Sequence, residues 1–128
     1  MQKTIDYWME EAAEALQVAE HLFEKKDYSY SLFFGHLAVE KILKAIYVKK
    51  KEVHAPQIHN LFRLAEHSSI VLSPEQKDAL IRITAFNLES RYPDEKRSFR
   101  KKCDEAFTSS ELSQVKEVFQ WLKSIVTS

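Results

Sequence analysis

The stretch YSLFFGHLAVEKILKAIYVKKK, residues 30–51, reads as one long helix, and the rest of the chain has to cover it. Most of it is apolar, but His36, Glu40, Lys41 and Lys44 stand inside it. At about 100° per residue, His36, Glu40 and Lys44 fall within an arc of about 80°. The opposite side of the helix is therefore expected to face a core.

The core side of this stretch contains the only glycine of the chain, Gly35. A glycine in a helix interior costs about 1 kcal/mol relative to alanine, so we expect a neighbouring helix to approach closely there. Phe33, Leu37 and Tyr47 project into the polar arc, although a solvated face rarely carries such residues. We expect the arc to face a groove or a second subunit, and the alternative is an ordinary ion-paired helix edge. The residues assigned to the core side are Ala38, Val39, Ile42, Leu43, Ala45 and Ile46.

The composition restricts the fold class. The chain has 128 residues, which corresponds to a single domain over 1–128. One glycine and three prolines are too few for the turns that hairpins need, so we expect an all-α protein. Basic and acidic residues number 19 each, which leaves no net field to attract DNA or a membrane.

Cys103 is the only cysteine, which excludes an internal disulfide and favours a reducing, cytoplasmic location. A catalytic thiol also needs a base, and no nearby residue supplies one, so we expect this thiol to be inert. The sequence shows neither a membrane-spanning apolar run nor a secretory signal.

Two long helices are expected in the first part of the chain. Thr4 is the predicted N-cap of the first, and Asp27 or Ser29 begins the second, which runs to about Lys50. The short connection between them predicts antiparallel neighbours. The first helix carries an apolar stripe made of Ile5, Trp8, Met9, Ala12, Leu16, Ala19, Leu22 and Phe23.

The middle of the chain has clear helix signals. Residues 52–60 contain a proline and are expected to form a loop, followed by a short helix over 61–67. Ser73 is a predicted N-cap, with Pro74 at the first helical position and Gln76 completing a capping box.

The helix that starts at Ser73 should end near Arg91, because Pro93 disfavours a helical residue before it. Residues 93–107 are polar and are expected to be irregular with at most a helical turn, and Thr108 with Glu111 marks the start of the last helix. The predicted architecture is an up-and-down bundle of four long helices plus one short helix. Its expected core residues are Trp8, Leu16, Phe23, Ile42, Leu43, Ile83, Phe86, Phe119 and Leu122.

Three stretches together resemble the HEPN family, which is named for nucleotide binding in higher eukaryotes and prokaryotes. Residues 28–48 resemble the second helix of the family, residues 58–66 its histidine-led short helix, and residues 87–95 its arginine-tyrosine-proline signature. Their order and separation agree with the family over nearly the whole chain. The pattern in the first stretch is carried by Ala38, Glu40, Lys41, Leu43 and Lys44.

The resemblance implies a helical bundle that often dimerises. Small members of the family frequently accompany a minimal nucleotidyltransferase as a toxin–antitoxin-like pair. Many relatives are RNases, in which a histidine follows an arginine after four to six residues and moves the proton of the 2′-hydroxyl.

The chain departs from the RNase pattern. Only Arg63 and His67 stand in the required order, with three intervening residues, and no histidine follows Arg91. We therefore expect no catalytic residues, and a degenerate RNase site remains the alternative. The sequence also predicts no cofactor, because it has no glycine-rich loop to hold phosphates.

No metal site is expected. His54 with His59, or His36 with Glu40, would need further ligands at a suitable spacing, and the sequence offers none. These histidines are more simply interpreted as loop or helix-edge residues.

The function we expect is a non-catalytic binding module for a nucleotide, a nucleotidyltransferase partner, or both. Lys41 and Lys44 are expected to converge with Arg91 on a phosphate, while Tyr92 and His36 contact base or ribose. Alternatively, Arg91 and Tyr92 cap the fourth helix and pack the fifth. The candidate ligand-binding residues are His36, Glu40, Lys41, Lys44, His59, Arg91, Tyr92 and Asp94.

The mixed polar arc of the second helix and the wide apolar stripe of the last one predict a symmetric homodimer. A purely structural homodimer that neutralises a partner protein is the remaining alternative. His59 is expected to cap its short helix or to bond within the bundle, and Asp94 to pair with Arg91.

Overall fold

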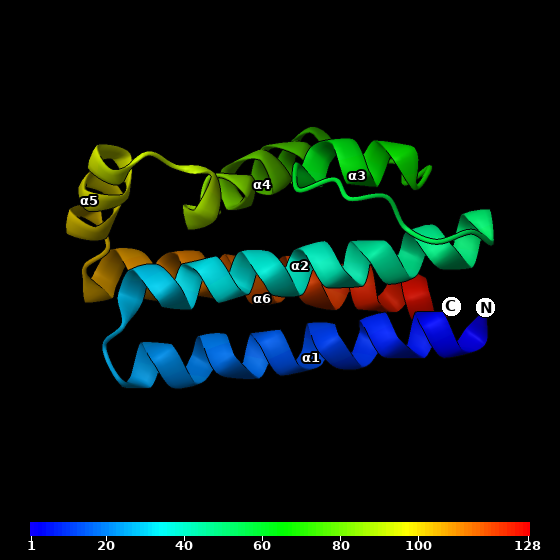
Figure 1. The fold of residues 1–128 in the computed structure, drawn as a ribbon, viewed down its shortest axis with the longest axis horizontal. Coiled ribbons are helices and arrows are strands. Elements are labelled where there is room, and N and C mark those ends of the chain that lie inside the picture. Colours follow the sequence, from blue (N-terminus) through cyan, green and yellow to red (C-terminus); the bar gives the residue numbers. More distant parts are fainter.

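Three long helices lie side by side along the molecule in the computed structural model, which describes residues 1–128 (Figure 1). They are α1 (Gln2–Glu24), α2 (Tyr28–Lys51) and α6 (Glu105–Thr127). Helix α1 runs opposite to α2, and both chain ends lie at one end of the molecule. Shorter elements cover the other side: α3 (Leu61–His67), α4 (Pro74–Thr84), the 3-10 turn η1 (Leu88–Ser90) and α5 (Pro93–Lys102). The all-α helical bundle expected from the sequence is confirmed.

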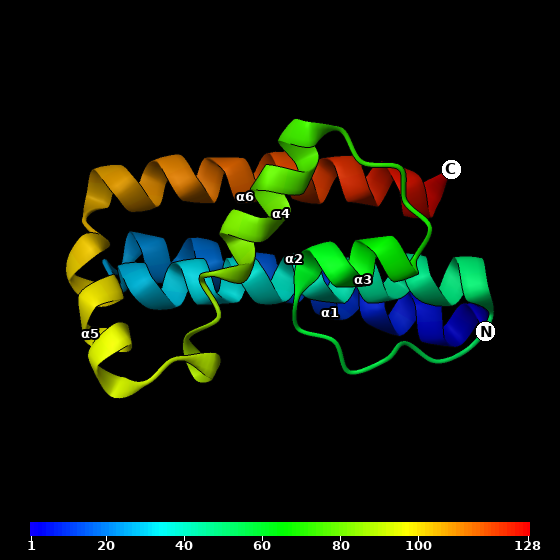
Figure 2. The same ribbon diagram turned by 90° about the horizontal axis from the view of Figure 1, so that it is seen from above.

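Helix α2 is the centre of the fold. It packs against α1 on one side and α6 on another, while α3 lies along it and α4 crosses over it (Figure 2). Fifteen of its 24 residues are buried, among them the predicted core residues Ile42 and Leu43, which are 0% exposed. A helix covered from so many directions cannot keep a solvated face over most of its length.

Alanines form the contact between α1 and α2. Ala12 and Ala19 are 0% exposed, and the Ser31 hydroxyl of α2 donates to the Ala19 carbonyl at 2.7 Å. Small side chains let the two backbones approach closely, so the bulky residues of α1 flank the contact. Trp8, Leu16 and Phe23, which were predicted in the core, are partly buried and pack against it.

Gly35 lies where α6 crosses α2. A methyl group added at Gly35 would stand 3.2 Å from Cγ1 of Val115 on α6. The predicted close approach of a neighbouring helix is confirmed, and it explains why a residue with poor helix propensity occupies this position.

Several helix boundaries differ from those expected. Helix α1 begins at Gln2, so Thr4 is not its N-cap. Helix α4 ends at Thr84 and not near Arg91, because the chain turns at Ala85 and buries Phe86 in the core. The capping box at Ser73 is present as predicted.

Helix α5 occupies most of the segment that was expected to be irregular. Pro93 is its first residue, a position that proline favours because its missing N–H would have no partner there. Asp94 and Glu95 lie in the first turn, and three basic residues end the helix, which suits the helix dipole. Helix α6 then begins at Glu105 with Asp104 as its N-cap, so Thr108 lies inside the helix.

None of the helices combines the length and the apolar character that crossing a membrane requires.

The central position of α2 makes its core residues sensitive to truncation. Leu43→Ala should lower the free energy of unfolding by about 2–5 kcal/mol, because it leaves a cavity among well-packed neighbours. Chemical denaturation of the purified variant measures this loss. Val71→Ala is the control, since Val71 is 93% exposed and should change stability by no more than about 0.5 kcal/mol. Equal small losses for both variants would contradict the assigned core.

Candidate functional site

The polar residues of α2 are buried inside the chain. His36, Glu40 and Lys44 are 0%, 4% and 8% exposed, and with His59 from the loop before α3 they form what we call the polar cluster. They were expected to face a groove or another subunit; in the folded chain they are largely covered, although His36 and Glu40 line a small hollow. Helix α1 and the 52–60 loop cover this side of α2, and the charges are paired with one another.

The carboxylate of Glu40 is the centre of the polar cluster. Its Oε2 lies 3.2 Å from Nζ of Lys44, and its Oε1 accepts from Nδ1 of His59 at 3.1 Å. Nε2 of His36 stands 3.7 Å from the same Oε1. A buried carboxylate is costly unless it is paired and hydrogen-bonded, and this arrangement supplies both.

Lys44 connects the polar cluster to α1. Its Nζ lies 4.9 Å from the centroid of the Trp8 ring, so the ammonium group sits between an aromatic face and the Glu40 carboxylate. Lys41, one turn back, points elsewhere and pairs with Glu11 at 3.2 Å. The two lysines therefore have different partners and do not share the single anion site that their spacing predicted.

Burial favours the neutral form of His36 in the folded protein. Burial lowers the pKa of its imidazole below the ordinary 6.5, and this effect exceeds the opposing influence of the Glu40 carboxylate. Nε2 donates to the His59 carbonyl at 3.3 Å, since a carbonyl oxygen can only accept. Nδ1 is therefore the bare nitrogen, and it has no partner in the chain.

His59 has one side in the polar cluster and one side in solvent. Its side chain is 64% exposed, and a carboxylate can only accept, so Nδ1 carries the proton shared with Glu40. In the neutral ring Nε2 is then free to accept a proton. A hollow of about 260 Å³ lies here, which we call the His59 hollow, and its lining includes Asn87, Glu89 and Ser90. An imidazole oriented by a buried carboxylate is a geometry that acid–base chemistry uses.

Arg91 closes the end of α4 and packs on α5. Its Nε and Nη2 donate to the Ala85 carbonyl at 2.9 and 2.5 Å, and its guanidinium lies 5.1 Å from the Phe99 ring centroid. The arrangement agrees with the alternative in which Arg91 caps the fourth helix and packs the fifth. Tyr92 is 74% exposed, and no ion pair joins Arg91 to Asp94.

A larger hollow of about 370 Å³ lies between α4, α5 and α6. We call it the Arg91 hollow, and it contains two of the predicted site residues, Arg91 and Asp94. Four further members, Glu95, Ser98, Phe99 and Lys102, were missed because α5 was not predicted, although the proline-acid-basic order of that helix was a usable signal. The lining residues are Arg82, Ala85, Phe86, Arg91, Asp94, Glu95, Ser98, Phe99, Lys102, Phe107 and Glu111.

The eight candidate residues are thus distributed over several places. The His59 hollow includes His36, Glu40 and His59, while the Arg91 hollow includes Arg91 and Asp94. The segment from Phe86 to Arg91 contributes residues to both.

Thiol and metal chemistry find no support in this arrangement. Burial raises the pKa of Cys103 to about 11, in agreement with the expectation of an inert thiol. No group of three or more His, Cys, Asp or Glu side chains is placed to hold a metal ion.

Comparison with known proteins supports one family. Residues 5–125 match the family described as HEPN domain. The crystal structure of TT1696 from Thermus thermophilus has the same fold, with a TM-score of 0.79 at 17% sequence identity, covering 98% of this chain and 99% of that chain. No curated protein matches the chain at a significant level.

The buried His36 predicts a pH dependence of stability. Between its lowered folded-state pKa and the ordinary value of 6.5, the unfolded chain binds more protons at this site than the folded protein does. The free energy of unfolding is therefore highest above pH 6.5, and it decreases as the pH falls from 6.5 toward the lowered pKa of His36. His36→Gln removes the titration but keeps a donor for the His59 carbonyl.

Denaturation series from about pH 7 to about pH 5 measure this effect, which amounts to about 1.4 kcal/mol for each unit by which the pKa is lowered. The free energy of unfolding should fall more steeply in the wild type than in His36→Gln. Parallel curves for the two proteins would show that His36 titrates normally in the folded state.

Proposed function

The chain belongs to the HEPN domain family, and we propose that it is a nucleotide-binding module without a catalytic role. The nucleotide occupies the Arg91 hollow. The observation that carries this proposal is that two cations line this hollow without a carboxylate partner. Arg91 lies over Phe99, and Nζ of Lys102 lies 5.1 Å from the Phe107 ring centroid.

These two cations are available to an anion. Arg82, the third cation of the hollow, pairs with Glu111 at 3.2 Å, whereas neither Arg91 nor Lys102 forms an ion pair. The guanidinium of Arg91 still has a free nitrogen, Nη1, because its bonds to Ala85 use Nε and Nη2. A phosphate between Arg91 and Lys102 gains charge-assisted hydrogen bonds from both.

The acidic residues of the hollow favour a whole nucleotide over a free phosphate. Asp94 and Glu95 stand in the first turn of α5 and would oppose a bare anion. Their carboxylates can accept from the amino groups of a base, while the phosphate lies on Arg91 and Lys102. The aromatic rings of Phe99 and Phe107 add apolar surface beside these groups.

The proposal includes protein partners. The resemblance of residues 28–48 and 87–95 to small HEPN members supports pairing with a minimal nucleotidyltransferase in a toxin–antitoxin-like system. A homodimer in the cytoplasm is also part of it, and exposed apolar side chains on and before α4, Ile81 and Val71, support such an interface. The polar arc of α2 contributes no surface to it, since that arc is covered within the chain.

A second candidate function is RNA cleavage at a site that departs from the arginine–histidine pattern. The pair of Glu40 and His59 is the observation that favours it, because the buried carboxylate orients an imidazole whose Nε2 is free in the His59 hollow. The lining of this hollow contains no cation to stabilise a phosphate, which is why we place the candidate second.

Nucleotide binding should depend on the two unpaired cations. Calorimetry with ATP and GTP should give dissociation constants on the order of micromolar or weaker, which rise with added salt. Arg91→Ala and Lys102→Ala should each weaken binding about tenfold, because each removes one charge-assisted contact.

Arg97→Ala is the matched control for this experiment. Arg97 is an exposed cation on the same helix and does not line the Arg91 hollow, so the variant should bind as the wild type does. Lys102 is exposed, so its truncation should not disturb folding. Unchanged binding in Lys102→Ala and Arg91→Ala would show that the nucleotide does not bind in this hollow.

The purified protein should not cleave RNA above background. This expectation follows from the missing histidine after Arg91 and from the lining of the His59 hollow, which contains no lysine or arginine. Gel analysis of a short single-stranded RNA tests it, with His59→Ala and His67→Ala prepared in parallel. Cleavage lost in His59→Ala would establish the second candidate function, and cleavage lost in His67→Ala would assign it to the Arg63–His67 pair.

A further inference from the structure

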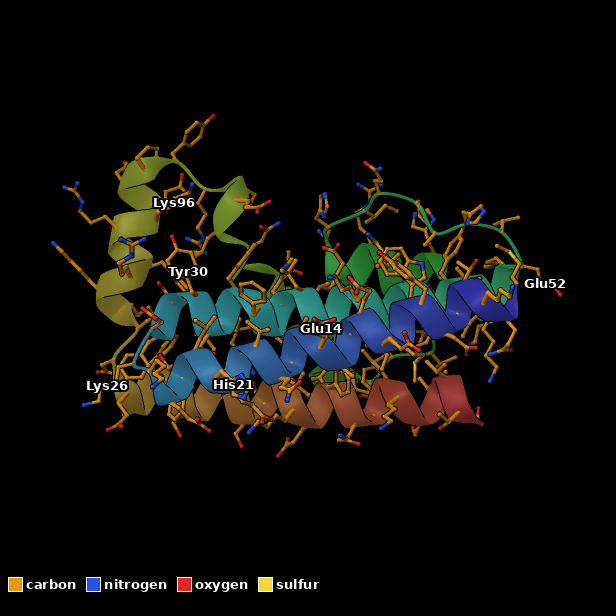
Figure 3. The ribbon with its side chains drawn as sticks, turned by 60° about the horizontal axis from the view of Figure 1, so that its bottom comes forward. Glu14, His21, Lys26, Tyr30, Glu52 and Lys96 are labelled. Carbon is orange, nitrogen blue, oxygen red and sulfur yellow. The ribbon has the colours of Figure 1, made fainter.

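The His59 hollow is lined by residues of α2, of the 52–60 loop and of the segment that contains η1. Figure 3 shows the loop leaving α2 beyond Glu52 and running back along that helix, and η1 lies on the same side of α2 (Figure 2). The hollow measures about 260 Å³. Sites for drug-sized ligands typically measure about 300–1,000 Å³, so this hollow suits a smaller molecule.

The imidazole of His36 is the sign that something binds here. The residue is 0% exposed and lines the hollow, and its Nε2 donates to the His59 carbonyl. Its Nδ1, the bare nitrogen of the neutral ring, is buried and has no hydrogen-bond partner in the chain. Buried polar atoms are nearly always hydrogen-bonded. A bare imidazole nitrogen can only accept, so the missing partner is a hydrogen-bond donor.

Two further groups of the hollow can only accept. Nδ1 of His59 donates to the Glu40 carboxylate, so Nε2 of the neutral ring is an open acceptor. The carboxylate of Glu89 forms no ion pair. Burial lowers the pKa of His36, and the Glu89 carboxylate is among the groups that oppose this effect, which places it near the imidazole. Open acceptors therefore gather at this place without a donor to match them.

The charge of the hollow is negative. No lysine or arginine lines it, and its two carboxylates are those of Glu40 and Glu89. Lys44 lies 3.2 Å from the Glu40 carboxylate and neutralises it, which leaves the charge of Glu89 uncompensated. A ligand that donates hydrogen bonds and carries a positive charge satisfies both the open acceptors and this charge. A metal ion does not fit, because no three suitable side chains are placed to hold one.

From these features we infer that the His59 hollow binds a small organic cation with N–H donors, which is a guanidinium or a primary ammonium group. The N–H groups of the ligand donate to Nδ1 of His36 and Nε2 of His59, and its positive charge lies beside Glu89. A planar guanidinium offers a fork of donors, whereas an ammonium group offers three donors around one nitrogen. This site is separate from the Arg91 hollow and does not rest on the nucleotide binding proposed above.

An NMR titration of the full chain with methylguanidinium chloride tests the inference at about pH 8, where ordinary histidines are neutral. The imidazole nitrogen signal of His36 Nδ1 should shift and saturate, with a dissociation constant on the order of millimolar. Tetramethylammonium chloride at the same concentrations is the matched control, since it carries the charge but no N–H donor and should not produce this shift. Methylammonium in a third titration distinguishes the two donor groups, because the tighter binder of the two identifies the class.

The variant Glu89→Gln separates binding from folding. Glu89 is exposed and forms no ion pair, so the melting temperature should not fall, while methylguanidinium binding should weaken about fivefold. Glu66→Gln is the matched control, since Glu66 is an exposed carboxylate of α3 that does not line the hollow. This variant should titrate as the wild type does.

Two results would overturn the inference. One is a His36 Nδ1 signal that responds to neither cation, or equally to methylguanidinium and tetramethylammonium, because no ligand N–H would then reach this nitrogen. The other is a Glu89→Gln variant that titrates like the wild type. Lys102→Ala, which should weaken nucleotide binding, should leave this titration unchanged, because Lys102 lines the Arg91 hollow and not this one. Failure at one site is therefore distinguishable from failure at the other.

Discussion

The burial of the Glu40 carboxylate is the constraint around which this bundle is arranged. A carboxylate that is 4% exposed needs partners, and the chain supplies them from α2 itself through Lys44 and from the 52–60 loop through His59. The loop is held against α2 because His59 has to reach Oε1. Lys44 in turn lies on Trp8, which connects the same charge to α1. One buried group thus links two helices and a loop.

Close packing at small residues makes that burial possible. The alanines of α1 and the single glycine of α2 let neighbouring helices approach α2 from two sides. When neighbours enclose a helix in this way, its polar residues are buried together with its apolar ones. The polar arc of α2 therefore acts inside the protein, and the surface groups available to a ligand come from other elements.

Helix α5 provides most of those groups. Arg91 precedes it, Lys102 ends it on the side of the Arg91 hollow, and Arg100 lies over Tyr30 near the start of α2. These three cations lie over aromatic rings and not beside carboxylates, which leaves their charge available. The proposed nucleotide site therefore depends on α5, a helix of ten residues.

The sequence by itself determined the helical class, the Ser73 capping box and the close approach at Gly35, because each depends on local backbone chemistry. It did not predict α5, since Pro93 reads equally as the end of one helix and the start of the next. Only the tertiary structure decided that His36, Glu40 and Lys44 are interior. Helical periodicity places residues on one face, but whether that face meets solvent depends on segments distant in the chain, here Trp8 and His59.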